Sequence, residues 1–421
     1  MKSCFPTAPQ RYEGSEFKMT ELGPIPSDWE VKRLGEIGEP LMCKRILKSQ
    51  TLDSGDVPFY KIGTFGGAAD AYISQSLYES YRRKYSYPKK GDVLLSAAGT
   101  IGRAVVYDGR DAYFQDSNIV WLDNDESLVL NEYLYWWYKV ISWKTEDGGI
   151  VTRLYNNNLK LSLIALPPLP EQRRIAAALS DMDELIGALG KLVEKKRAIK
   201  TGAMQRLLTG QTRLPGFGGA EFKQTELGPI PSDWEVKRLG EIGEFSTSTV
   251  PASSIDATWY VGTETMLANM KGIVPNEASV PYQSVREYRE GDILISNIRP
   301  YLKKIWLADR NGGCSTDVLV IRVVDGNSCI PAFLKMLLSN DAFFDFAMAN
   351  AIGTKMPRGD KKVLINYEWA LPPLPEQRAI AAVLSDMDAA IAALEAEKHK
   401  VEAIKQGMMQ ELLTGRVRLE A

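Results

Sequence analysis

The chain has 421 residues, of which 45% are hydrophobic and 25% charged, and its formal net charge is −2. This length predicts two to four domains, and the near-neutral charge argues against a strongly basic nucleic-acid-binding protein unless its basic surface is local. The sequence contains no run of about 18 apolar residues that would predict a membrane span. Its first residues also lack the apolar centre of a signal peptide.

The first distinctive segment is Thr20–Glu39, which reads TELGPIPSDWEVKRLGEIGE and returns letter for letter at Thr225–Glu244. The offset is 205 residues (20 to 225). The prolines and glycines of this opening segment predict a turn that leads into a strand. A repeat of this size indicates a duplicated domain, because solenoid repeats are far shorter.

A variable segment follows each copy of the opening segment. Pro40–Ala165 and Phe245–Ala370 have equal length but mostly different residues. Their short apolar runs and many turns predict mixed α/β structure. The clearest predicted strands are GDVLLS at Gly91–Ser96 and GDILIS at Gly291–Ser296.

Each variable segment then contains an aromatic-rich apolar stretch, at Tyr133–Tyr138 and at Phe333–Leu338, that predicts a helix. Such residues at helical spacing usually fill a core. We therefore interpret Tyr135, Trp136 and Trp137 as core or subunit contacts rather than as base-stacking residues.

A second exact repeat, LPPLPEQR, closes each variable segment at Leu166–Arg173 and Leu371–Arg378, again 205 residues apart (166 to 371). Pro170 suits a first helical turn, and apolar residues then recur about every 3.5 residues. Gly210 is a typical helix stop after Leu-Leu-Thr, and the second copy ends in the same way at Gly415. The pattern predicts two helices of roughly 39 residues, each about 58 Å long.

Two arrangements of these helices fit the pattern. Each helix can lie on its own domain, or the two can pair antiparallel about a local two-fold axis. The equal lengths of the duplicated helices favour the pair. Because a turn of B-DNA is about 34 Å, such a rod would act as a ruler that holds two DNA-contacting modules more than one turn apart.

We therefore predict an α+β fold with a pseudo-two-fold internal repeat. Two mixed α/β recognition domains are separated by two long helices that form an antiparallel coiled coil. The expected divisions are residues 1–165 (opening region and first recognition domain), 166–215 (first spacer helix), 216–370 (opening region and second recognition domain) and 371–421 (second spacer helix).

No catalytic constellation emerges from the residues. The single histidine, His399, has no counterpart in the first half and predicts an exposed helix residue rather than part of a triad or metal site. The string Asp28–Lys32 resembles a metal-dependent nuclease motif, but Met1–Ser27 lacks the upstream aspartate that such a site needs. The double prolines that begin at Pro167 and Pro372 resemble an adenine-methyltransferase motif without its essential Asn or Asp, and no phosphate-binding loop is present.

The four cysteines predict the cellular compartment. Cys4, Cys43, Cys314 and Cys329 show no CxxC spacing and do not match between the two halves. We interpret them as incidental thiols in a reducing compartment and expect a cytoplasmic protein.

Polar loops are the best candidates for contact with double-stranded DNA, because Arg, Lys, Asn and Thr match the donors and acceptors of base edges. The basic run from Tyr81 to Lys90 adds cations that neutralise phosphates, although such a run is as often a solvated face. Arg153 and Arg358 occupy the same repeat position (205 apart), which favours both. The first-half candidates are Arg82, Arg83, Lys84, Lys89, Lys90, Arg103, Thr152, Arg153, Tyr155, Asn156 and Asn157. The second-half candidates are Asn297, Arg299, Tyr301, Lys303, Lys304, Lys355, Arg358, Lys361 and Lys362.

The duplicated motifs together resemble the specificity subunits of type I restriction-modification systems. The resemblance rests on the IPSDWEV and KRLGEI strings, on the GDVLLS and GDILIS strands, and on LPPLPEQRRIAAALSDMDELI followed by a long helix that ends in LLTG. These features occur twice, the second time with small changes, and they cover essentially the whole chain. The combination is far more specific than any one motif.

The resemblance implies a non-catalytic subunit with two target-recognition domains, each reading one half of a bipartite DNA site, and two helices that set the gap. It implies that two modification (methyltransferase) subunits dock on the repeated frame and that restriction/motor subunits join them. S-adenosylmethionine, ATP and Mg would bind to those partners, so this chain is expected to hold no cofactor or metal.

Because the two variable segments differ, the DNA target should be asymmetric. One alternative is a protein-interaction scaffold or antirestriction-like protein without sequence-specific DNA binding, and another is an enzyme with an unrecognised site. Residues 1–19 share only Glu16–Lys18 with the second half, and the sequence assigns them no role.

Overall fold

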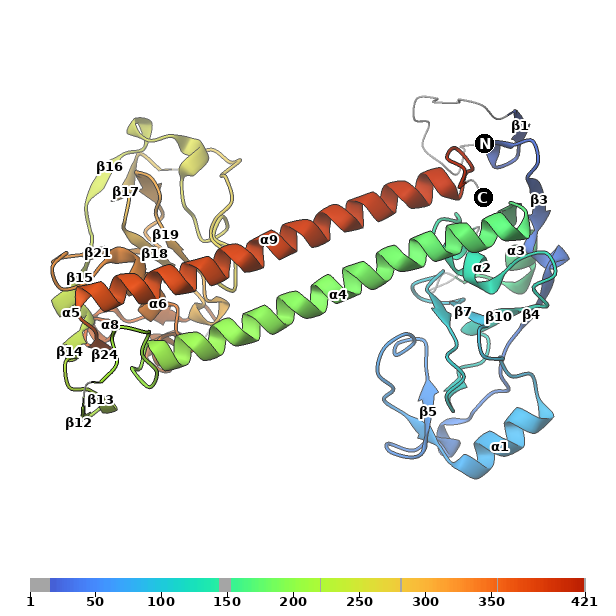
Figure 1. The fold of residues 1–421 in the computed structure, drawn as a ribbon, viewed down its shortest axis with the longest axis horizontal. Coiled ribbons are helices and arrows are strands. Elements are labelled where there is room, and N and C mark those ends of the chain that lie inside the picture. Colours follow the sequence, from blue (N-terminus) through green and yellow to red (C-terminus); the bar gives the residue numbers. More distant parts are fainter. Residues whose placement is uncertain (1–15, 144–152, 220, 281, 354, 420–421) are drawn as a thin grey trace. The chain divides into compact units, whose positions relative to one another are not determined.

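The computed structural model describes residues 16–143, 153–219, 221–280, 282–353 and 355–419. The chain divides into two compact units. Unit 1 consists of Met1–Gly190 and Ala396–Ala421, and unit 2 consists of Lys191–Glu395. Unit 2 is therefore one continuous segment, whereas unit 1 combines the two ends of the sequence (Figure 1).

The described part of unit 1 contains short strands, three short helices and parts of two long helices. These elements are β1 (Phe17–Thr20), β2 (Gly23–Pro26), β3 (Glu30–Arg33), β4 (Gly38–Leu41), β5 (Val57–Tyr60), β6 (Tyr72–Ile73), α1 (Gln75–Lys84), β7 (Val93–Ser96), β8 (Ala104–Val106), β9 (Tyr113–Phe114), β10 (Ile119–Asn124), α2 (Asn131–Tyr138), α3 (Asn156–Leu161), β11 (Leu163–Leu166) and the long helices α4 (Leu169–Leu207) and α9 (Leu374–Leu412). The central antiparallel sheet has the order β4-β10-β7-β8, and a second sheet has the order β6-β5-β9.

Unit 2 repeats this plan around its own parts of α4 and α9. Its other elements are β12 (Phe222–Thr225), β13 (Gly228–Pro231), β14 (Glu235–Arg238), α5 (Leu239–Ile242), β15 (Gly243–Phe245), β16 (Thr249–Pro251), β17 (Ser284–Tyr288), β18 (Ile293–Ser296), β19 (Ile305–Leu307), β20 (Gly312–Cys314), β21 (Val318–Val323), α6 (Pro331–Leu338), α7 (Asp341–Ala349), β22 (Ala351–Ile352), β23 (Arg358–Gly359), α8 (Lys361–Leu364) and β24 (Glu368–Leu371). The central sheet has the equivalent order β15-β21-β18-β19. The second sheet has the order β16-β17-β20, and the parallel pair of β5 and β9 in unit 1 is reduced in unit 2 to a single parallel bridge between Val261 and Cys314.

The strands β7 and β18 lie inside the two central sheets because every residue of each is apolar or small and is buried. Gly91 and Gly291 precede them with φ angles of 96° and 87°, a backbone conformation that favours glycine. The strands predicted at GDVLLS and GDILIS are thus confirmed, as are the helices predicted at the aromatic stretches, which form α2 and α6.

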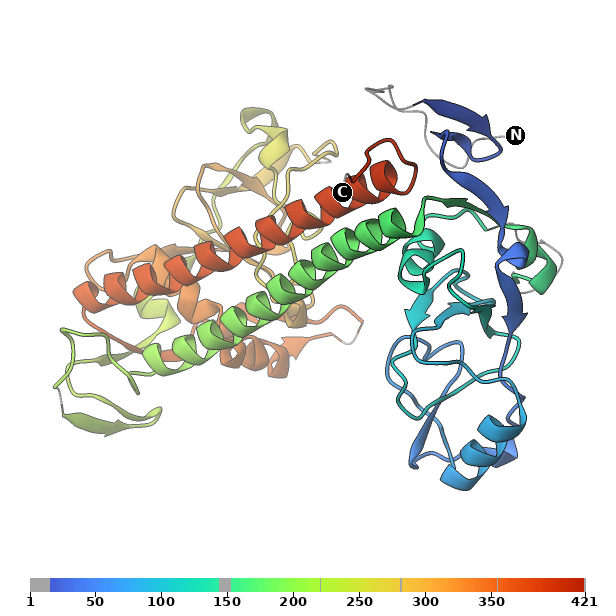
Figure 2. The ribbon, with the colours of Figure 1, turned by 45° about the vertical axis from the view of Figure 1, so that its right-hand side comes forward.

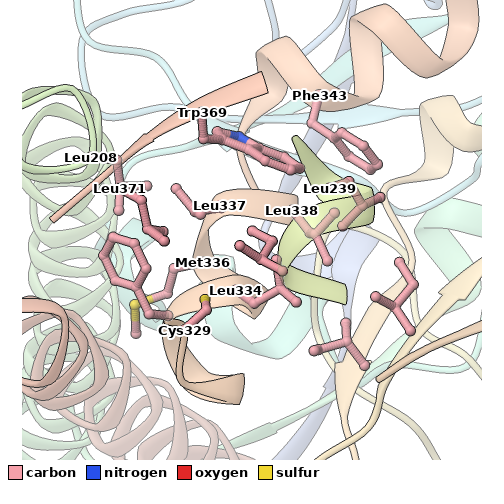
Figure 3. Close-up of a cluster of buried hydrophobic side chains, with 14 of the residues drawn as sticks. Leu208, Leu239, Cys329, Leu334, Met336, Leu337, Leu338, Phe343, Trp369 and Leu371 are labelled. Atoms are coloured by element: carbon pink, nitrogen blue, oxygen red, sulfur yellow. The ribbon is translucent and has the colours of Figure 1, made fainter. Parts of the chain in front are cut away.

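Each central sheet packs on a helix through a large buried cluster. In unit 1, Trp136 and Trp137 of α2 are 1% exposed and belong to this core, as predicted. In unit 2, leucines of α6 fill the equivalent space, and the rings of Phe343 and Trp369 lie 5.7 Å apart above them (Figure 3).

The predicted long helices are confirmed, and each has 39 residues. Within unit 1, the start of α4 lies beside the end of α9, where Asp183 forms an ion pair with Lys405. Within unit 2, the end of α4 lies beside the start of α9, where Lys200 Nζ is 2.5 Å from Asp388 Oδ1 (Figures 1 and 2). The two helices therefore run antiparallel in each unit. Each helix also contributes to a domain core, so both arrangements considered from the sequence contribute to the fold.

The repeated LPPLPEQR motif ties each long helix to its unit. Gln172 is fully buried, and its Nε2 donates to the carbonyls of Pro167 and Leu128 while its Oε1 accepts from the Leu130 N–H. Gln377 makes the equivalent three hydrogen bonds in unit 2. This buried polar anchor explains why the motif is the same in both halves.

Candidate nucleic-acid interface

In unit 2, two of the predicted DNA-contacting loops meet at the end of the central strand β18. Ile298 and Arg358 form an isolated β-bridge. The Arg299 N–H donates to the Pro357 carbonyl at 2.9 Å, and the Gly359 N–H donates to the Asn297 carbonyl at 3.3 Å. The fold thus brings together residues about 60 positions apart in the chain, and we call this contact the loop junction of unit 2.

The first of these loops presents some of its polar side chains to solvent and ties others down. Arg299 and Lys303 have positive φ angles of 52° and 49°, an uncommon conformation for residues other than glycine. Lys303 Nζ is 2.7 Å from Asp341, and Lys304 Nζ donates to the Thr263 carbonyl at 2.6 Å. Arg299 and Tyr301 remain exposed.

The second loop carries the candidate cations Lys355, Arg358, Lys361 and Lys362. The Arg358 side chain is half exposed and forms an ion pair with Asp317 at 2.9 Å. Lys361 lies over the ring of Phe245, and burial, followed by the nearby positive charge of Arg286, lowers its pKa. Lys355 and Lys362 are exposed.

Arg286 was not predicted from the sequence. It lies on β17 and donates through Nη1 to the Val318 carbonyl at 2.8 Å, beside the loop junction of unit 2. The sequence shows no basic run at this position, because the neighbouring Glu287 and Glu290 bring the local net charge close to zero.

Unit 1 forms the equivalent loop junction. Ala98 and Arg153 form an isolated β-bridge, and the Leu154 N–H donates to the Ala97 carbonyl at 2.9 Å. Arg153 and Tyr155 are exposed. The shared repeat position of Arg153 and Arg358 therefore corresponds to a shared place in the two units.

The other first-half loop candidates lie around this junction. Asn156 and Asn157 begin α3, where Asn157 is exposed and Asn156 is half-buried. Arg103 is exposed, although its Nη1 donates to the Phe65 carbonyl at 2.7 Å. Thr152 lies outside the described residues.

The predicted basic run lies elsewhere in unit 1, on α1 and the turn after it. Arg82 lies over the rings of Tyr78 and Tyr87, and Arg83 donates to a carbonyl of its own helix. A hollow of ≈ 390 Å³ opens beside this helix and is lined by Arg82, Tyr87, Pro88, Lys89, Lys90, Tyr107 and Gly109. The run is thus partly held by the protein and partly available to an anion.

A second basic segment, which was not predicted from the sequence, lies against this run. Lys44 Nζ is 5.3 Å from the ring centre of Tyr85, and Lys84 Nζ is 5.6 Å from the same ring. Arg45 pairs with Asp116 at 2.8 Å and remains largely exposed. The sequence pattern could have indicated this segment, because the cations Lys44, Arg45 and Lys48 are interspersed with the apolar residues Cys43 and Ile46, which are buried.

The residues considered for catalysis have structural roles. The His399 side chain is 79% exposed on α9 and lies 3.1 Å from Glu402 through Nδ1, as predicted for an exposed helix residue. Asp28 binds Arg418, and Lys32 pairs with Glu30 at 3.5 Å. Within the described ranges, no group of three or more His, Cys, Asp or Glu residues is arranged to hold a metal ion.

The cysteine thiols that the structure describes are poorly placed to react. Cys43, Cys314 and Cys329 are buried and free, and burial raises the pKa of each thiol to about 12. Such thiols are poor nucleophiles. Cys4 lies outside the described residues. Across the part of the chain that the structure covers, no helix has the length and apolarity needed to cross a membrane.

Comparison with known proteins agrees with this arrangement. The family model for the type I restriction modification DNA specificity domain matches residues 26–196 and 231–403. A putative type I restriction enzyme specificity subunit of Haemophilus influenzae is 59% identical over 160 residues, which are 38% of this chain and 42% of that relative. The putative type I restriction enzyme MjaX specificity subunit of Methanocaldococcus jannaschii is 29% identical over 441 residues, which cover 98% of this chain and 99% of the relative.

Two solved structures share the fold. The S subunit of a type I restriction-modification system from M. genitalium superposes with a TM-score of 0.55 and 15% identity, over 91% of this chain and 96% of that one. A chain from a structural study of assembly and conformational transition in the type I R-M system gives a TM-score of 0.53 and 18% identity, over 93% and 99% of the two chains. Because the family model matches both halves over most of their length, the chain belongs to the DNA specificity subunits of type I restriction-modification systems.

Proposed function

We propose that the two units each read one half of an asymmetric, bipartite DNA target. As a specificity subunit, the chain serves sequence recognition rather than acting as a scaffold without DNA binding. The observation that carries the proposal is the loop junction, where an equivalent β-bridge and an equivalent backbone hydrogen bond hold an arginine in both units among otherwise different side chains. Different donors and acceptors held in equivalent places would read different bases.

The repeated opening segments are the proposed contact sites for two modification subunits. Glu21, Glu30 and Glu36 are exposed in unit 1, and their identical counterparts are exposed in unit 2. With the exposed Arg33 and its counterpart Arg238 beside them, these carboxylates form a charged surface that is identical in the two units and suits contact with a protein partner of complementary charge. Identical exposed residues in two places fit two copies of one partner.

Catalysis is proposed to take place in those partners. Methylation by modification subunits and ATP-dependent cleavage by restriction/motor subunits would bring S-adenosylmethionine, ATP and Mg to the complex, in the cytoplasm. The proposed part of this chain is to position the complex on its target.

Exchange of residues 40–165 for the matching segment of another specificity subunit tests whether each unit reads its own half-site. We expect methylome sequencing of a host carrying the exchanged subunit and its partners to show one altered half-site, with the other half-site unchanged. The same exchange at residues 245–370 serves as the matched control and should alter the opposite half-site.

Footprinting of the complex tests DNA reading itself. Two protected patches, separated by about one helical turn or more, are expected from two recognition units. A single continuous patch on every DNA sequence would contradict the proposal.

A further inference from the structure

A carboxylate holds Arg358 at the loop junction of unit 2. Asp317 Oδ1 is 2.9 Å from Arg358 Nη2, and both side chains are partly exposed. The backbone fixes both partners, because the Asn297 N–H donates to the Asp317 carbonyl at 2.8 Å and Ile298 pairs with Arg358. Arg358 is therefore held at two places, its backbone by the bridge to Ile298 and its guanidinium by Asp317.

This ion pair is not required for the fold. In unit 1 the Ala97 N–H donates to the Asn118 carbonyl at 2.7 Å, so Asn118 occupies the place that Asp317 has in unit 2. The unit 1 junction forms with this neutral residue, and no ion pair is found for Arg153 among the described residues. Partly exposed ion pairs also contribute little to stability. The carboxylate thus distinguishes the two units without supporting their common structure.

We infer that Asp317 positions Arg358 to read a guanine in the half-site of unit 2. This inference rests on the proposed function. Arg has five N–H donors in a planar fork that matches O6 and N7 of guanine, and the ion pair occupies only one of its outer nitrogens. A held side chain loses less conformational entropy on binding, and the negative charge of Asp317 opposes a phosphate contact by the same side chain.

The positive charges around Arg358 would contact the phosphate backbone of the DNA while Arg358 contacts a base. Arg286 lies beside Val318, the residue after Asp317, and Lys361 begins the helix after Arg358. Together with Arg358 they outnumber the carboxylates of Asp317 and Asp360, so the junction remains net positive. The exposed Lys355 and Lys362 of the second loop are then available for phosphates, while Arg358 is directed to a base.

Selection from a pool of DNA duplexes tests the inference with the full chain in complex with the other subunits of its system. The wild-type complex should select guanine at one position of the unit 2 half-site. Arg358→Ala and Asp317→Asn should each reduce the preference at that same position by about 10-fold or more, and the double variant should be no worse than Arg358→Ala. Asp317→Glu, which keeps a carboxylate, should restore part of the preference.

Asp309→Asn is the matched control, because it removes an exposed carboxylate that pairs with Arg310 in the same unit. It should leave every base preference unchanged. If Asp317→Asn alters affinity for all sequences equally while the wild type remains selective, the inference is wrong and the proposed function stands. If the wild-type complex selects no sequence, both are wrong.

Discussion

At the scale of single residues, Arg213 and Arg418 form the same contacts in the two units. Arg418 binds both carboxylate oxygens of Asp28 at 2.9 Å and both of Glu171 at 2.6 Å. Arg213 binds Asp233 and Glu376 in the same way. Each arginine follows the end of a long helix and ties it to an opening segment and to the start of the other long helix.

Replacing either arginine should be costly, because the carboxylate between the helices is buried. The Glu376 side chain is 0% exposed, so Arg213→Ala would leave a buried negative charge that accepts a hydrogen bond from the indole N–H of Trp234 but has lost its cation. We expect a loss of about 3–5 kcal/mol in the free energy of unfolding of unit 2, measured by denaturant titration. Arg289→Ala, which removes a partly exposed ion pair with Glu287, should cost less than about 1 kcal/mol. Equal losses for the two variants would contradict the assignment.

The same contact predicts a pH dependence in unit 1. The hydrogen bond from Arg418 lowers the pKa of Asp28 below its usual value of 3.8. A carboxylate whose pKa is lower in the folded state adds stability above its unfolded pKa, and this stability is lost as the pH falls through the folded pKa. Asp28→Asn should therefore reduce the loss of stability on acidification below about pH 4, measured by thermal unfolding at a series of pH values. Parallel curves for the variant and the wild type would exclude this contribution.

At the scale of elements, the turns that end the long helices require glycine, because of their backbone conformation and their close approach to a proline. Gly210 has a φ of +72°, and a Cβ there would lie 2.5 Å from Pro231 Cδ. Gly210→Ala should therefore destabilise unit 2 by at least about 1 kcal/mol, through backbone strain and the clash. Gly202→Ala is the matched control, because nothing lies within 4 Å of a Cβ at this position in α4. This control should stabilise the protein by up to about 1 kcal/mol, and chemical denaturation measures both effects.

Much of the element structure was predictable because its causes are local. The apolar period of α4 and α9, the proline at each start and the glycine at each end all lie within the helices themselves. The loop junctions were only partly predictable. The repeat position indicated Arg153 and Arg358, but the pairing of Arg358 with Asp317 depends on strands that are distant in the sequence. No local pattern marks an isolated aspartate as the partner of an arginine about 40 residues away.

At the scale of the whole molecule, the ruler hypothesis makes a quantitative prediction. Seven residues add about 10.5 Å to a helix and preserve the heptad pattern of an antiparallel pair. Inserting one heptad near Lys191–Arg197 and one near Lys398, which lies beside Gly190, should lengthen the gap of the DNA target by about three base pairs. Methylome sequencing should then show both half-sites unchanged. An altered half-site sequence would refute the ruler, and a heptad in only one helix should disrupt the pair.

The interleaving of the chain was not predictable from its repeats. The repeats indicate halves that follow one another, whereas unit 1 takes its last residues from the end of the sequence. The cause is the antiparallel pair, since the end of each long helix meets the start of the other. Leu412 and Leu413 consequently complete the core around Trp29, as Leu207 and Leu208 complete the core around Trp234.

This interleaving also sets an order of assembly during protein synthesis. Unit 2 needs only the continuous segment Lys191–Glu395, but unit 1 lacks part of its core until Ala396–Ala421 has also emerged from the ribosome. The half that is synthesised first is therefore the half that finishes folding last. Until Arg418 has emerged, Trp29 and Glu171 of unit 1 lack the arginine that neutralises the buried carboxylate.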